Sequence, residues 1–98
     1  MKPDRLRSMI GIAQKAGKLV SGEFAAEASV RSGEAKLVIV AGDASGNTKK
    51  LFNNKCKHYG VPLNEVLTKE ELGHSIGKEY RAVAAVLDKG IADAILKI

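Results

Sequence analysis

Aromatic residues and cysteine are scarce in this chain of 98 residues. It contains no tryptophan, two phenylalanines, two tyrosines and a single cysteine, Cys56, so an internal disulfide is excluded. Apolar runs such as residues 37–41 are far shorter than the roughly 20 residues that a membrane-spanning helix needs. The first residues show no apolar stretch of the kind found in signal peptides. We therefore expect a cytoplasmic protein with no membrane partner.

Motifs for catalysis and metal binding are also missing. There is no Gly-x-x-x-x-Gly-Lys-Ser/Thr phosphate loop, and His58 and His74 are the only histidines. Cys56 and His58 could supply two metal ligands, but no second pair accompanies them, and Cys56 falls on an apolar helical stripe typical of a core residue. Asp43 follows an apolar strand, where α/β enzymes place acids, but without a clear partner we interpret it as a turn-capping residue. The sequence thus predicts a non-enzymatic protein without metal or cofactor.

What the chain does contain suits one ordinary globular domain spanning residues 1–98. Hydrophobic residues make up 45% and charged residues 28% of it. The net charge is +5, and the basic residues fall into two clusters, residues 1–18 and 49–60, each with a net charge of +4. Such clusters favour a polyanionic partner, although solvated helix faces are an alternative explanation for each of them.

Hydrophobic periodicity predicts helices alternating with strands. The expected helices cover residues 4–16, 21–32, 48–59, 68–76 and 88–98, and the expected strands cover residues 18–20, 36–41, 61–63 and 82–87. Ser21 and Asp88 are expected to cap helices, and Thr68 with Glu71 forms a predicted capping box. Residues 37–40 and 82–87 are apolar at every position, as in strands covered on both faces. This order predicts an α/β sandwich with helices on both sides of a small sheet.

Two segments are candidates for binding. Ser21-Gly22-Glu23 begins a predicted helix, where free amide groups can meet a phosphate or a base edge and glycine permits close approach. Phe24 follows, either as a core residue or as an exposed platform for an unstacked base. Residues 78–81 form a polar turn before the last strand, in which an aromatic ring can stack and two cations can reach phosphate; an ordinary exposed loop is the alternative.

Several segments, taken in order, resemble the kink-turn RNA-binding ribosomal protein superfamily. They are residues 16–22, residues 33–41 and residues 69–73, followed by Gly77, Glu79 and the small-residue strand from Ala82. Residues 43–50, Asp-Ala-Ser-Gly-Asn-Thr-Lys-Lys, are closer to its bacterial, YlxQ-like branch. The resemblance covers essentially the whole chain without large gaps.

This resemblance implies a three-layer α/β/α sandwich around a four-stranded mixed sheet. It also implies a non-catalytic, monomeric protein that binds structured RNA in a ribosomal or other ribonucleoprotein setting. A protein-interaction module that keeps the fold without the RNA site is the alternative. The implied amide donors are Gly22 and Glu23, stacking is expected from Phe24 or Tyr80, and phosphate contacts from the cations. The full set of implied RNA-binding residues is Lys18, Gly22, Glu23, Phe24, Lys36, Lys78, Glu79, Tyr80 and Arg81.

The chain departs from the archaeal kink-turn binders at three positions after Gly22. Those relatives carry Asn and Glu two and three residues after the glycine and Lys three residues further on, and these groups hold sheared G·A pairs. This chain has Phe24, Ala25 and Ala28 at those places. We therefore expect it to bind a standard kink-turn more weakly than a relative with the polar residues does.

Overall fold

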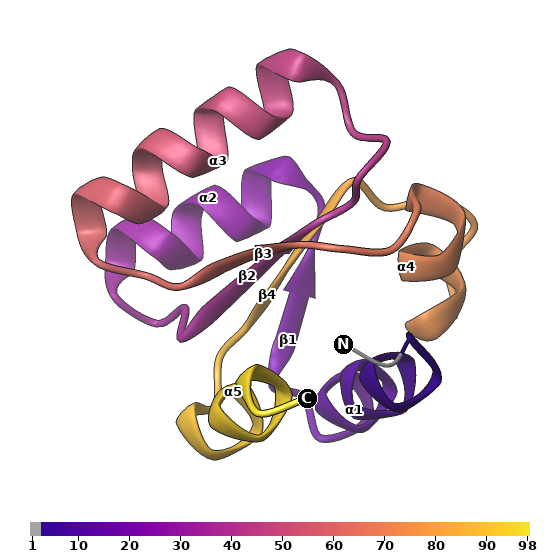
Figure 1. Ribbon diagram of the computed structural model, residues 1–98. Coiled ribbons are helices and arrows are strands. Elements are labelled where there is room, and N and C mark those ends of the chain that lie inside the picture. Colours follow the sequence, from indigo (N-terminus) through magenta and orange to yellow (C-terminus); the bar gives the residue numbers. More distant parts are fainter. Residues whose placement is uncertain (1–2) are drawn as a thin grey trace.

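Five helices alternate with four strands along residues 3–98, the part of the chain that the computed structural model describes (Figure 1). The helices are α1 (Pro3–Lys15), α2 (Glu23–Ser32), α3 (Gly46–Tyr59), α4 (Lys69–Ser75) and α5 (Lys89–Leu96). The strands are β1 (Leu19–Ser21), β2 (Leu37–Val40), β3 (Leu63–Glu65) and β4 (Val83–Val86). The predicted α/β alternation is confirmed element by element.

The strands form one mixed sheet in the order β1-β4-β2-β3. Strand β4 is antiparallel to both of its neighbours, whereas β2 and β3 are parallel. The two central strands are buried at every residue, and the shorter β1 and β3 lie at the edges. The predictions of two central apolar strands and of edge strands near Lys18 and Pro62 are therefore confirmed.

Helices cover both faces of the sheet and complete three layers. Strand residues Leu37 and Ile39 pack toward α1, α4 and α5, whereas Val38 and Val40 pack toward α2 and α3 with the fully buried Phe52. This division follows from the period of two in a strand, which sends successive side chains to opposite faces. In Figure 1, α2 and α3 lie together on one side of the sheet and α1, α4 and α5 on the other.

Local capping signals specify most helix starts. Thr68 and Glu71 form the predicted capping box, and the Asp88 carboxylate accepts a hydrogen bond from the amide of Ile91 at 2.8 Å. The prediction that Ser21 caps α2 is wrong, because Ser21 pairs with Ala84 in the sheet and is held extended as the last residue of β1. Gly22 is the N-cap instead, with a φ of 90° that side-chain-bearing residues rarely adopt.

Helix α3 begins earlier than its sequence pattern indicates. Gly46 and Asn47 belong to its first turn, although the helix was predicted to begin at residue 48. Ser45 is the N-cap, and its side chain accepts a hydrogen bond from the amide of Thr48 at 3.1 Å. The cap satisfies a first-turn amide that would otherwise need water, so the helix starts directly after it.

Cys56 is a core residue, as its position on the apolar stripe of α3 predicted, and is 2% exposed. Burial raises the pKa of its thiol to about 11. The thiol of an unfolded chain has a lower pKa, about 8.5. Ionisation of this group therefore does not affect stability below that pH, and it lowers stability as the pH rises from there toward 11. We expect the folded protein to be inert to a thiol-specific disulfide reagent at neutral pH and the denatured protein to react. Rapid labelling of the native protein would contradict this placement.

No helix within residues 3–98 combines the length and the apolar content needed to cross a membrane.

Candidate functional site

Three chain segments meet at one end of the sheet. The amide of Gly22, between β1 and α2, donates to the carbonyl of Val83 at 2.9 Å. The amide of Ala41, at the end of β2, donates to the carbonyl of Ala82 at 2.8 Å. The β1–α2 junction, the β2–α3 loop and the loop that precedes β4 therefore lie side by side, at the upper end of the sheet in Figure 1. We call this surface the loop end.

Arg81 joins two of these segments. Its Nε donates to Ser21 Oγ at 3.1 Å and its Nη1 donates to the carbonyl of Tyr80 at 2.7 Å. Its backbone amide donates to the carbonyl of Lys69 at 3.1 Å, which attaches the last loop to α4. A guanidinium has five N–H donors, so these two side-chain bonds leave donors for a further acceptor. Arg81 is thus positioned at the loop end, half-buried and oriented by fixed partners.

The starts of α2 and α3 are tied together at the same end. The Glu23 carboxylate accepts a hydrogen bond from the hydroxyl of Thr48, a buried residue in the first turn of α3. Thr48 also accepts a hydrogen bond from the Ser45 hydroxyl at 2.9 Å. The carboxylate of Glu23 therefore has a structural partner, and both helices present their amide ends at the loop end. Two helix N-termini side by side give this surface a positive partial charge that favours anions.

Two exposed aromatic rings flank the junction of Ser21 and Arg81. Phe24, on the first turn of α2, is 87% exposed, so the core interpretation of this residue is wrong. Tyr80, in the last loop, is 59% exposed. More than half of the surface of each residue is therefore accessible to a ligand.

The last loop lies directly against α4. Gly73 of α4 is buried, and its carbonyl accepts a hydrogen bond from the amide of Lys78 at 2.8 Å. A Cβ at Gly73 would lie 2.5 Å from the carbonyl oxygen of Glu79, so only glycine permits this approach. The side chains of Lys78 and Glu79 are exposed, and Glu79 and Tyr80 line a shallow hollow beside α4.

Lys18 and Lys36, both predicted to contact RNA, lie at the opposite end of the sheet. The amide of Leu87 donates to the carbonyl of Lys18, and the amide of Lys36 donates to the carbonyl of Val86, each at 2.8 Å. Val86 is the last residue of β4 and Leu87 follows it, whereas the loop end adjoins the start of β4, about 13 Å away along four residues. The structure therefore brings together the predicted residues 22–24 and 78–81 and separates the two lysines from them.

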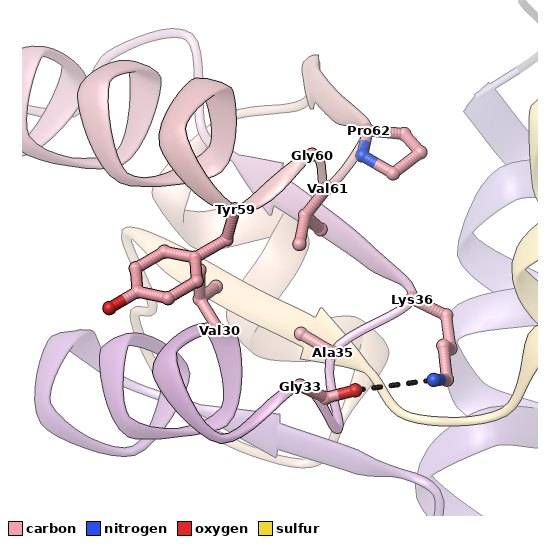
Figure 2. Close-up of a pocket in the computed structure, with 8 residues that line it drawn as sticks. All are labelled: Val30, Gly33, Ala35, Lys36, Tyr59, Gly60, Val61 and Pro62. Carbon is pink, nitrogen blue, oxygen red and sulfur yellow. Dashed lines mark hydrogen bonds between the residues drawn. The ribbon is translucent and has the colours of Figure 1, made fainter.

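Lys36 has a structural role at that opposite end. Figure 2 shows a pocket between the last turns of α2 and α3, in which Tyr59 lies beside Val30 and Lys36 is on the other side. The Lys36 ammonium donates to the carbonyl of Gly33 at 3.2 Å, directly after the last turn of α2. A cation beside a helix C-terminus stabilises the carbonyl groups that have no partner within the helix.

The β2–α3 loop also belongs to the loop end, although no residue in it was predicted as a site residue. Asn47 and Lys50 are exposed on the first turns of α3, whereas Lys49 forms an ion pair with Glu65 at 3.5 Å. Asp43 accepts a hydrogen bond from the amide of Lys69 at 2.7 Å, in the first turn of α4. Asp43 therefore bonds a distant helix start, which differs from its interpretation as a turn-capping residue. The resemblance of residues 43–50 to the bacterial branch of the family was the sequence signal that could have identified this loop as part of the site.

Within residues 3–98, no three His, Cys, Asp or Glu side chains gather as a metal site would require.

Several known proteins are similar to this chain in sequence and in fold. The model of the ribosomal protein L7Ae/L30e/S12e/Gadd45 family matches residues 4–96. The RNA-binding protein YlxQ of Bacillus subtilis (strain 168) is 43% identical over 90 residues, 92% of this chain and 90% of that protein. The large ribosomal subunit protein eL30 of Yarrowia lipolytica is 31% identical over 98 residues, 94% of this chain and 86% of that protein.

A solved structure agrees with these matches. A Bacillus halodurans protein described as having unknown function superposes with a TM-score of 0.89 at 34% identity, covering 94% of this chain and 93% of that one. The α/β fold with its mixed sheet is thus shared with a sequence relative, and the resemblance seen in the residues is confirmed. Because the family model spans nearly the whole chain, this protein belongs to the ribosomal protein L7Ae/L30e/S12e/Gadd45 family and has YlxQ proteins among its relatives.

Proposed function

We propose that this protein is a single non-catalytic domain that binds structured RNA through the loop end, as a monomer in a ribosomal or ribosome-associated setting in the cytoplasm. The observation that carries the proposal is the convergence of two helix N-termini, the Arg81 guanidinium and two exposed aromatic rings on one surface. Two relatives support it, because one is named an RNA-binding protein and the other a large ribosomal subunit protein.

Each group at the loop end has a role suited to RNA. The amide of Glu23, in the first turn of α2, can donate to a phosphate or a base edge, whereas the amide of Gly22 already donates to the carbonyl of Val83. The missing Cβ at Gly22 leaves open space beside the backbone. Arg81 and Lys78 can contact phosphates, and the exposed Glu79 carboxylate can accept from a base amino group. Lys50, on the second turn along α3, extends the same cationic surface.

A protein-interaction module is the second candidate function. The positions after Gly22 favour it, because Phe24, Ala25 and Ala28 supply no polar side chain there. In that case the same surface would bind a protein partner, and purified protein would show no affinity for structured RNA at low salt. The clustered cations and amide ends at the loop end favour RNA.

Binding to structured RNA is expected to depend strongly on salt and on Arg81. The logarithm of affinity should fall linearly with the logarithm of salt concentration, with a slope of roughly 0.7–0.9 per neutralised phosphate. Arg81→Ala should weaken binding about tenfold. It should also reduce the magnitude of that slope by roughly 0.7–0.9, the contribution of one phosphate contact. Fluorescence anisotropy titrations of labelled structured RNA over a range of salt concentrations measure both quantities.

Lys36→Ala is the matched control, because it removes one positive charge at the opposite end of the sheet. Its affinity and salt slope should stay close to those of the unmodified protein, and circular dichroism should show that both variants are folded. Equal losses in the two variants would place the RNA elsewhere on the molecule. A flat salt dependence would argue against RNA binding altogether.

A further inference from the structure

Phe24 is the most exposed of the large apolar side chains in residues 3–98. Its backbone is held firmly although its ring is free. The preceding Gly22 donates its amide to Val83, and the neighbouring Glu23 is bonded to the buried Thr48 of α3. The ring therefore projects from a fixed helix start. Ordering a ligand against a fixed ring requires little further loss of conformational freedom by the protein.

The surroundings of Phe24 are polar. Among the described residues, the other strongly exposed large apolar side chains are Ile12 and Leu96 on α1 and α5, Tyr59 at the far end of α3, and Tyr80. Only Tyr80 shares the loop end. The β2–α3 loop and the first turn of α3 contribute exposed residues without large apolar side chains, namely Gly42, Asp43, Ser45, Gly46 and Asn47. An isolated ring among polar groups and cations differs from the contiguous apolar patch that a protein partner usually covers.

Phe24, Ala25 and Ala28, on the first two turns of α2, have no side-chain group that could hydrogen-bond a base. The Glu23 carboxylate accepts from Thr48, and Glu27 forms an ion pair with Lys55 of α3 at 3.9 Å. At this helix start, the group that can contact a base is the flat face of the Phe24 ring. Backbone amides of the first turn and Arg81 lie at the same end of the sheet. An aromatic face binds any base by stacking, but only when that base is not enclosed in a continuous stack of pairs.

We infer that Phe24 is a stacking platform for an unpaired base, so that the preferred ligand is RNA with an unstacked nucleotide in a loop or bulge. This inference rests on the proposed function and adds to it the class of RNA. Arg81 and the amide of Glu23 position the RNA backbone, and the ring selects an open nucleotide over a closed duplex.

The absence of tryptophan from the chain permits a direct test. Phe24→Trp keeps an aromatic platform and introduces a single tryptophan as a fluorescent probe, whereas Phe24→Leu keeps an apolar side chain and removes the aromatic face. The two RNA probes are a stem-loop pool with a randomised loop and a fully paired duplex of the same stem. Tyr59→Leu is the matched control, because it removes an exposed ring at the opposite end of the sheet.

We expect Phe24→Leu to weaken binding to the stem-loop pool about tenfold, with duplex affinity and the Tyr59→Leu variant unchanged. Phe24→Trp should retain stem-loop affinity, and its fluorescence should be quenched by the stem-loop pool and much less by the duplex. If Phe24→Leu binds the stem-loop pool as well as the unmodified protein does, or if tryptophan quenching is equal for both RNAs, the inference is overturned while RNA binding stands. If the unmodified protein binds neither RNA at low salt, the proposed function itself fails, and a protein partner becomes the occupant of this surface.

Discussion

Gly73→Ala is expected to destabilise the protein by about 2–3 kcal/mol. The new Cβ would lie 2.5 Å from the carbonyl oxygen of Glu79 and 2.8 Å from the amide nitrogen of Tyr80. Both are backbone atoms, so no side chain can rotate away, and the last loop must move off α4. The same movement should disturb Tyr80 and Arg81 and thereby weaken RNA binding.

Thermal unfolding measures the loss of stability caused by Gly73→Ala. In a domain of this size, 1 kcal/mol corresponds to about 4–8 °C in Tm, so a decrease of about 10 °C or more is expected. Gly46→Ala is the control, since its Cβ would meet no heavy atom within 4 Å in the first turn of α3. That change should leave Tm unchanged or raise it slightly. An unchanged Tm for Gly73→Ala would mean that the last loop does not pack on α4 as described.

The triple change Phe24→Asn, Ala25→Glu and Ala28→Lys is expected to tighten binding to a standard kink-turn at least tenfold, about 1.4 kcal/mol. Polar groups that bond base edges contribute about 1–3 kcal/mol each to discrimination, and this chain has none at these three places. Because Phe24 and Ala28 are four residues apart, they are neighbours on the surface of α2, so the new groups would act on one side of the helix. The same variant should lose the preference for an unpaired base that we infer for Phe24.

A titration of fluorescently labelled kink-turn RNA against both proteins at fixed salt measures this effect. An RNA in which the G·A pairs are disrupted is the control, and it should bind both proteins weakly. Tight binding of the intact kink-turn by the unmodified protein, lost on the control RNA, would show that other residues read the G·A pairs. Equal affinity of the two proteins for the intact kink-turn would show that these positions do not contact it.

The local sequence alone determined the elements of this fold. Continuous apolar residues in segments 37–40 and 82–87 predicted two central strands, and the observed β2 and β4 are buried throughout. The capping residues Thr68 and Asp88 specified helix starts to the residue, because a cap bonds an amide only three residues away. The family was also evident from the order of short segments. These signals lie within a few residues of one another, and their physical causes are equally local.

Tertiary structure alone decided how the predicted site residues are distributed. The strand order depends on hydrogen bonds between residues distant in sequence, and the antiparallel pairing of β1 and β2 with β4 carries Lys18 and Lys36 to the end opposite Arg81. Phe24 could have been buried or exposed, because helical periodicity does not say how far the first turn of α2 extends beyond the sheet. The close approach of the last loop to Gly73 likewise depends on how α4 packs. Each of these outcomes is set by contacts across the fold, which a local pattern does not contain.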